Sequence, residues 1–241
     1  MENVLKRFFG KGVYPHQLSF LLDSALRRLI LSPERLADRL RLKPDSHVLE
    51  VGSGPGYFSV EVGRRVPRGR LVLLDLQREM LLKARRKVAA AGLQNVSVVQ
   101  ADASALPFRE ASFDVVFLAA VLGEVHDPGA CLRAAFAVLR TDGTLSVTEQ
   151  PGDPDALSAS TIQSLAAEAG FCFTQRFGKR RSFTLNFGKR PPVLQGREQN
   201  QPQGGTTART MMCKRCRDPG RSVNKNGPVA SNKRTEGNQW S

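Results

Sequence analysis

A run of closely spaced glycines directly after a short apolar strand constrains the fold of this chain more than any other feature. The strand is predicted at residues 47–51, and the loop that follows reads Gly52-Ser53-Gly54-Pro55-Gly56. Glycines at alternate positions remove the β-carbons that would hold a ligand away from the backbone. A helix is predicted at residues 57–65, and its N-terminal amides would favour an anionic group beside the loop. This order is typical of the first unit of a nucleotide-binding α/β sheet.

The first 190 residues continue this alternation of strand and helix. Further strands are predicted at residues 70–75, 95–100, 113–120 and 144–149, and helices at 16–30, from Ser32 onwards, at 78–91, from Asp127 to about 142 and at 160–169. Such alternation predicts parallel strands with crossover helices on both faces. Residues 171–177 and 182–187 instead read as an antiparallel hairpin. We therefore predict an α/β fold, a doubly wound, Rossmann-like and mostly parallel sheet with a C-terminal antiparallel hairpin.

The composition changes at Pro191-Pro192, beyond which the chain is polar and rich in Gly and Asn. Such a segment buries too little apolar surface to offset the entropy of ordering. We predict three parts: an N-terminal helical cap at residues 1–44, the α/β domain at 45–190 and a disordered basic tail at 191–241.

The net charge of +14 raises the question of a nucleic-acid partner. Residues 1–190 hold 27 Lys and Arg against 19 Asp and Glu, and the tail holds nine against three. No run of five like charges occurs, and the densest cluster is Lys179-Arg180-Arg181. A solvated basic surface accounts for this pattern better than nucleic-acid binding, which stays open.

Several compartments and site types are disfavoured by the sequence. No apolar stretch reaches the roughly 18 residues of a membrane span, and the N-terminus lacks the order of a secretory signal. The four cysteines are too few for a disulfide-stapled fold, so a reducing, cytoplasmic location is expected. Cys213 and Cys216 resemble half a zinc site without further ligands, and no metal is predicted. Cys131 and Cys172 have apolar neighbours and are predicted to lie in the core.

Asp75 lies 21 residues after Gly54, at the end of the second predicted strand. An acidic side chain there can accept hydrogen bonds from both hydroxyls of a ribose, so the pattern predicts a cofactor that carries a nucleoside. The third glycine of the dinucleotide fingerprint G-x-G-x-x-G is replaced by Tyr57. An NAD-dependent oxidoreductase is disfavoured for this reason.

With these features in order, the sequence resembles the class I S-adenosylmethionine-dependent methyltransferases over about residues 45–187. The resemblance is closest to small bacterial enzymes of the UbiE type, which methylate quinone precursors. The matching segments are Glu50-x-Gly52-x-Gly54-x-Gly56, Asp75, Ala101-Asp102-Ala103 with Leu106-Pro107-Phe108, Ser112–Val116 and Leu139–Leu145. The family implies S-adenosyl-L-methionine as the cofactor.

The resemblance also implies roles for individual residues in binding this cofactor. Glu50 would orient the amino group, and the backbone of Gly52, Ser53, Gly54 and Gly56 would line the methionine portion. The segment that begins at Leu118 and ends at Leu122 would lie beneath the sulfonium.

On the nucleoside side, the resemblance implies four further contacts. Asp75 would bind the ribose hydroxyls and Leu76 would lie against the adenine. Asp102 would accept a hydrogen bond from the adenine amino group, and the backbone of Ala103 would contact the ring.

The acceptor side departs from the family, because many relatives carry two histidines where this chain has Glu124 and His126. These two residues are the candidates for a general base. Tyr14 and His16 precede the domain, where relatives place a lid. A small-molecule acceptor is expected, with two alternatives: methylation of RNA or protein, or a non-catalytic basic binding module on the same fold.

Overall fold

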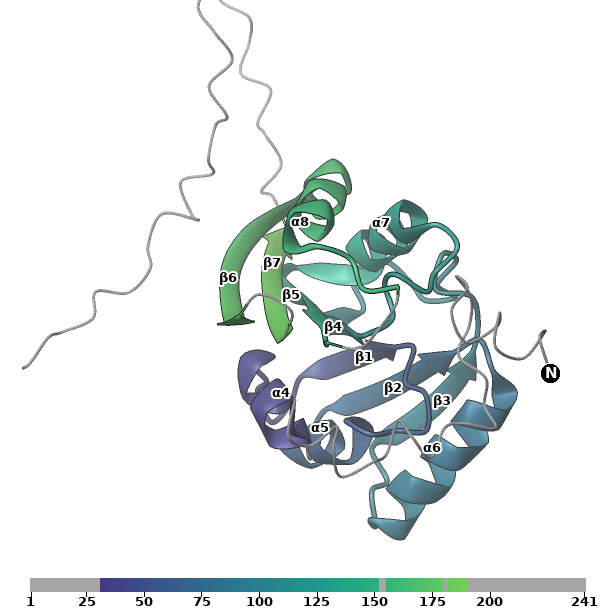
Figure 1. Ribbon diagram of the computed structural model, residues 1–241. Coiled ribbons are helices and arrows are strands. Elements are labelled where there is room, and N and C mark those ends of the chain that lie inside the picture. Colours follow the sequence, from purple (N-terminus) through teal and green to yellow (C-terminus); the bar gives the residue numbers. More distant parts are fainter. Residues whose placement is uncertain (1–30, 152–154, 180–181, 190–241) are drawn as a thin grey trace, which may run out of the picture. The chain divides into compact units, whose positions relative to one another are not determined.

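The computed structural model of the chain describes residues 31–151, 155–179 and 182–189, and within these ranges seven strands form one sheet (Figure 1). The predicted helix at 16–30, the candidates Tyr14 and His16, and the predicted tail at 191–241 lie outside the described residues.

The strand order is β3-β2-β1-β4-β5-β7-β6. The strands are β1 (His47–Val51), β2 (Arg70–Asp75), β3 (Val96–Gln100), β4 (Phe113–Ala119), β5 (Leu139–Glu149), β6 (Phe171–Lys179) and β7 (Ser182–Lys189). Strands β1 to β5 are parallel, whereas β7 pairs antiparallel with β5 and with β6. This arrangement confirms the predicted doubly wound sheet with its closing hairpin. The order reverses between β1 and β4, where ligands bind in sheets of this kind.

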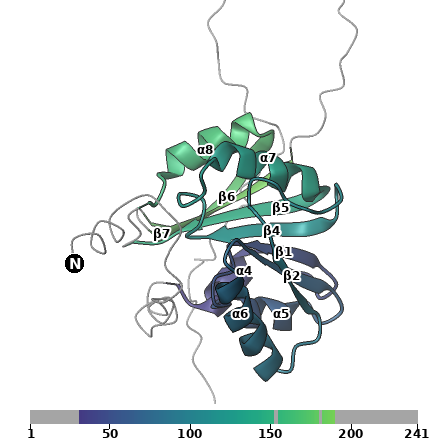
Figure 2. The ribbon, with the colours of Figure 1, turned by 90° about the vertical axis from the view of Figure 1, so that its right-hand side faces the viewer.

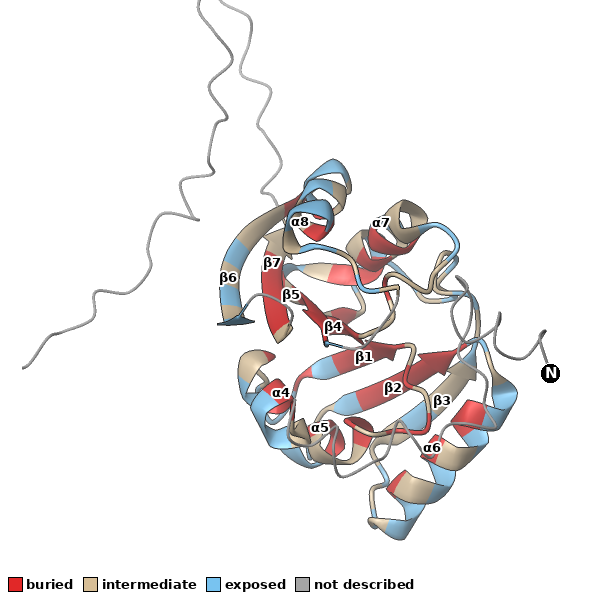
Figure 3. Ribbon diagram, viewed as in Figure 1, coloured by how far each residue is buried: buried red, intermediate tan, exposed pale blue. Residues whose placement is uncertain are grey.

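Helices cover both faces of the sheet (Figure 2). One face carries α4 (Pro33–Arg39), α5 (Ser59–Arg65) and α6 (Arg78–Ala90), and the other carries α7 (Pro128–Val138) and α8 (Ala159–Glu168). Because both faces are covered, every residue of β4 except Asp114 is buried (Figure 3). The edge strand β6, by contrast, is only partly covered.

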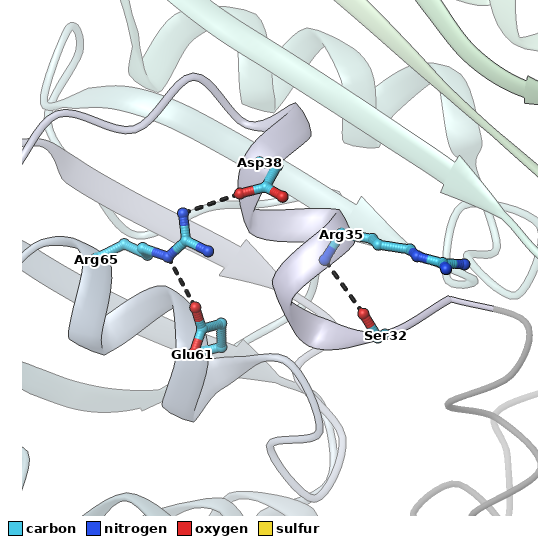
Figure 4. A network of polar contacts seen from close by, with 5 residues as sticks. All are labelled: Ser32, Arg35, Asp38, Glu61 and Arg65. Carbon is cyan, nitrogen blue, oxygen red and sulfur yellow. Dashed lines mark hydrogen bonds and ion pairs between the residues drawn. The ribbon is translucent and has the colours of Figure 1, made fainter. Parts of the chain in front are cut away.

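The short helix α4 is fixed at its start and along its side. Ser32 accepts a hydrogen bond from the backbone N–H of Arg35, and Pro33 occupies the first helical turn, as the sequence predicts. Arg65 of α5 donates to Asp38 at 3.0 Å and to Glu61 at 2.7 Å, so that α4 and α5 are joined by an ion-pair network (Figure 4).

Two predicted helix boundaries were wrong. Helix α5 begins at Ser59 rather than at residue 57, because the chain turns continuously from residue 54 to 58. Helix α7 ends at Val138 instead of near residue 142. Leu139 is fully buried and pairs with Phe113, which places it in extended backbone and starts β5 there. Residues 140–143 then form an irregularity before the regular ladder with β4 resumes at Thr144.

Candidate cofactor site

The glycine loop turns sharply at the carboxyl end of β1. Gly52, Gly54 and Gly56 have φ angles of +69°, +54° and +78°, a region that favours glycine. The N–H groups of Gly52 and Ser53 both donate to the carbonyl oxygen of Leu74, at 2.8 and 3.0 Å. The loop is therefore held against the end of the neighbouring strand β2.

The three glycines differ in what surrounds them. A β-carbon at Gly52 would lie 2.5 Å from the methyl groups of Val121, and one at Gly56 would lie 3.1 Å from Ala84 of α6. A β-carbon at Gly54 would meet no atom within 4 Å. Gly52 and Gly56 thus permit close packing within the protein, whereas Gly54 presents bare backbone to open space. That open space leaves the backbone of Gly54 accessible to a ligand.

Asp75 lies at the end of β2 with its side chain turned to this loop. One carboxylate oxygen accepts the N–H of Gly54 at 2.8 Å and the other accepts the N–H of Gln77 at 2.9 Å. Burial raises the pKa of Asp75, and the hydrogen bonds from Gln77, Gly54 and Leu76 partly oppose this rise. A carboxylate has about four lone-pair sites, and these three backbone donors leave about one of them for a ribose hydroxyl.

A second buried carboxylate, Glu50, lies on β1 and is only 3% exposed. Ser59, at the start of α5, donates its hydroxyl to Glu50 at 2.6 Å. No sequence pattern pointed to Ser59, since its role depends on how the loop returns to the sheet. The hydroxyl of Ser53 is buried in the loop and has no hydrogen-bond partner. A polar ligand beside the loop would satisfy this group.

The predicted nucleoside-side residues lie at the ends of β2 and β3, which are joined by the N–H of Ala101 donating to the carbonyl of Asp75 at 3.2 Å. Asp102 is exposed and accepts the N–H of Ser104 at 2.7 Å. Ala103 is half-buried, and the side chain of Leu76 is 51% exposed. The structure therefore brings Asp75, Leu76 and Asp102 to one edge of the sheet.

The segment predicted to lie beneath the sulfonium begins inside the core. Leu118 is 1% exposed and packs with the apolar cluster around α7 and α8. The chain then turns at Ala120, where φ is +57° and the N–H donates to Thr148 at 2.8 Å. This turn brings Val121 against Gly52. The contact between this segment and the loop is thus made by Val121, and the role of Leu118 toward the cofactor stays a prediction.

The two candidate bases follow this turn. Glu124 is half-buried, and its backbone N–H donates to the carbonyl of Val121 at 2.9 Å. His126 is exposed and directly precedes Asp127, which caps α7 by accepting the N–H of Ala130 at 2.8 Å. Both residues are on the loop after β4, at the same edge of the sheet as the glycine loop, and their catalytic roles stay predictions.

Residues 31–151, 155–179 and 182–189 hold no group of three or more His, Cys, Asp or Glu side chains placed to bind a metal ion. None of the helices in these ranges combines the length and the apolar character that crossing a bilayer requires.

Comparison with known proteins agrees with this geometry. Residues 48–143, which contain the glycine loop, Asp75 and Asp102, match the family model described as a methyltransferase domain. This match, with the relatives and solved structures that follow, supports a methyltransferase domain of the class I S-adenosylmethionine-dependent type in this part of the chain.

Among individual relatives, the chain is similar to the ubiquinone/menaquinone biosynthesis C-methyltransferase UbiE of Hahella chejuensis. The two are 35% identical over 134 residues, which cover 54% of each chain. The chain thus spans about half the length of this curated relative.

Solved structures share the fold at lower identity. A SAM-dependent methyltransferase from Aquifex aeolicus matches with a TM-score of 0.67 and 22% identity, covering 73% of this chain and 98% of the other. The [4+2]-cyclase SpnF matches with a TM-score of 0.56 and 22% identity, covering 70% and 64%. Since a protein named as a cyclase shares the fold, the fold alone does not fix the reaction.

Proposed function

We propose that this chain transfers the methyl group of S-adenosylmethionine to a small organic acceptor of quinone-like chemistry. The observation that carries the proposal is the open space at Gly54 beside the buried carboxylate of Asp75. The name of the UbiE relative, a ubiquinone/menaquinone C-methyltransferase, supports a quinone-like acceptor.

In this proposal the residues at the carboxyl edge of the sheet each contact a different part of the cofactor. Asp75 binds the ribose hydroxyls, with Leu76 and Ala103 against the adenine and Asp102 accepting from its amino group. Glu50 and the backbone from Gly52 to Gly56 hold the methionine portion. When bound, the cofactor supplies an electrophilic methyl group on a leaving group that departs as a neutral thioether. The protein mainly aligns the acceptor, and alignment can supply up to about 7–11 kcal/mol of the barrier.

A general base is needed only when the acceptor must lose a proton, as carbon and phenol acceptors do. Glu124 and His126 are the proposed candidates for this step. With 1,4-naphthoquinol as the probe acceptor, replacing the true base by Gln or Asn is expected to lower kcat by 100-fold or more. The other substitution should leave kcat within a few-fold, and unchanged kcat in both variants would assign the proton transfer elsewhere.

The first experiment is a calorimetric titration with S-adenosylhomocysteine. Micromolar binding is expected for the wild type, and at least a tenfold loss for Asp75→Ala, since hydrogen bonds to a charged group contribute about 1.5–3 kcal/mol each. Asp142→Ala removes an exposed aspartate and should bind like the wild type. Absence of binding to the wild type would overturn the proposal and favour a non-catalytic binding module. Binding with methyl transfer to RNA or protein instead of a quinol would replace only the acceptor class.

A further inference from the structure

The hairpin at the edge of the sheet carries positive charge without any negative charge. The charged residues of β6 and β7 are Arg176, Lys179 and Lys189, and neither strand contains Asp or Glu. Strand β6 is the outer strand, and Arg176 and Lys179 on it are exposed. A basic edge strand also discourages pairing with other chains, so charge alone does not define a binding surface.

The end of α4 adds two arginines to the same edge. The guanidinium of Arg39 donates to the hydroxyl of Thr184 at 2.9 Å, and that of Arg41 donates to the side-chain carbonyl of Gln175 at 2.6 Å. Both partners are neutral, so these hydrogen bonds orient the guanidinium groups and leave their charges uncompensated. Burial and the charge of nearby Arg35 lower the pKa of Arg39.

Aromatic rings hold two of these arginines in place. The guanidinium carbon of Arg39 lies 5.7 Å from the ring centroid of Phe177, and that of Arg176 lies 5.2 Å from that of Phe183. Such cation–π contacts fix a planar donor group that binds phosphate in a bidentate manner and can also stack on a nucleobase. Arg39 and Arg41 lie on the face of the sheet that carries α4, whereas Arg176 lies over Phe183 on the face that carries α7 and α8. We use the name basic edge for the four residues Arg39, Arg41, Arg176 and Lys179, which border the outer strand β6 from both faces.

The basic edge fits a nucleic acid better than a lipid surface. Binding to a bilayer by a surface helix or strand normally combines basic residues with exposed apolar side chains. The large apolar side chains that are exposed within the described residues are Leu76 and Leu82, and both belong to the segment that runs from the end of β2 through helix α6. The sheet order places that segment at β2, away from the β6 edge.

We propose that the basic edge binds the sugar–phosphate backbone of a single-stranded nucleic acid. The surface lies outside the glycine loop, so the proposal is independent of methyl transfer. It also gives part of the basic charge of the chain a role in binding, whereas the sequence alone favoured a solvated basic surface.

The test measures fluorescence anisotropy of a labelled 20-nucleotide oligouridylate with the full chain. Four phosphate contacts predict a slope of about −3 in log K against log [KCl], or a loss of roughly fiftyfold between 50 and 200 mM. R41Q/R176Q should weaken binding about tenfold at 100 mM and reduce the slope by about 1.4. The control R85Q/R86Q removes two exposed charges from α6 and should change affinity less than twofold.

Each other outcome overturns the proposal. Failure of the wild type to bind the oligonucleotide would overturn it. Equal losses of affinity in the two double variants would overturn it as well, because binding would then depend on the overall charge and not on the basic edge. Binding to vesicles with 30% phosphatidylglycerol but not to the oligonucleotide would assign the edge to lipid. Titration with S-adenosylhomocysteine is run on every variant, so that loss of the fold or of the proposed cofactor site is recognised separately.

Discussion

The carboxylate of Asp75 accepts the backbone N–H of Gly54 at 2.8 Å, a contact that joins the end of β2 to the glycine loop after β1 across 21 residues of sequence. A second oxygen of the same carboxylate accepts from Gln77. Asp75 therefore shapes the loop that it faces, besides the proposed contact with a ribose. Substitutions at Gly52 and Gly54 distinguish the packing of the loop from the binding of a ligand.

Gly54→Ala is expected to fold and to lose cofactor affinity. Its β-carbon would enter the open space at the loop, and the positive φ of +54° adds a strain of about 1–2 kcal/mol. Gly52→Ala would instead push a β-carbon to 2.5 Å from Val121, so that variant should lose thermal stability by more than Gly54→Ala does. Calorimetry with S-adenosylhomocysteine and a thermal melt of each variant separate the two effects. Wild-type affinity in Gly54→Ala would show that the open space is not where the ligand lies.

The pH dependence of the site is expected to have opposite signs for affinity and for stability. Because burial raises the pKa of Asp75, the carboxylate protonates as pH falls through a value above that of an ordinary aspartate. A protonated Asp75 accepts ribose hydroxyls less well, so S-adenosylhomocysteine affinity should fall in that window. The folded state binds this proton more tightly than the unfolded state does. Its contribution to stability is thus present below the ordinary aspartate pKa and is lost as pH rises through the folded pKa.

Asp75→Asn is the variant that checks this linkage. The amide does not titrate, so both the affinity profile from calorimetry and the urea midpoint should lose their dependence on pH in this window. A wild type and an Asp75→Asn variant with parallel profiles would assign the titration to another group.

Much of the sheet could be predicted from the sequence because its strands are buried and apolar. Strands β1 and β2 have the predicted bounds, and the predicted hairpin closes the sheet. The errors fall where tertiary contacts decide. Leu139 reads as part of a helix until its pairing with Phe113 is known, and residue 57 reads as helical until the turn after Gly56 is known.

The candidate site divides in the same way. The glycines and Asp75 could be found because their spacing along the chain reflects backbone geometry. Ser59 and Val121 could not, since their contacts with Glu50 and Gly52 depend on how separate segments fold together. The basic edge is of the second kind, because Arg41 and Gln175 are 134 residues apart.

Ser59→Ala is expected to destabilise the protein by about 1.5–3 kcal/mol, the usual contribution of a hydrogen bond to a charged group. The hydroxyl of Ser59 donates to the carboxylate of Glu50. Because Glu50 is buried away from water, its carboxylate is stabilised by protein donors of this kind. Urea unfolding monitored by circular dichroism measures the change. Ser97→Ala, at an exposed position of β3, is the matched control and should stay within about 0.5 kcal/mol.

The two cysteines within the described ranges should differ in reactivity. Both were predicted to lie in the core, and Cys131 is indeed buried, whereas Cys172 is half-buried on β6. Burial, followed by the charges of Asp102 and Asp127, raises the pKa of Cys131 to about 12, so at pH 8 roughly one thiol in ten thousand is ionised.

In a C213S/C216S background, iodoacetamide at pH 8 is expected to modify Cys172 at least 100-fold faster than Cys131, as read by mass spectrometry of peptides. The added variant C172S should then remain unmodified until the protein is unfolded in urea. Rapid labelling of Cys131 in the folded protein would mean that α7 opens readily.

A chain that ends at Lys189 is expected to keep its thermal midpoint and its affinity for S-adenosylhomocysteine. The glycine loop, Asp75 and both core clusters are built from residues before this point, and the sequence beyond Pro191 has too few apolar side chains to form a core of its own. The same shortened chain lacks ten of the 36 Lys and Arg residues, so its affinity for oligouridylate should fall through the loss of general charge. The difference between R41Q/R176Q and R85Q/R86Q should nevertheless persist in it, because both pairs precede Lys189. A fall in stability or in cofactor affinity on truncation would show that residues 190–241 pack against the domain.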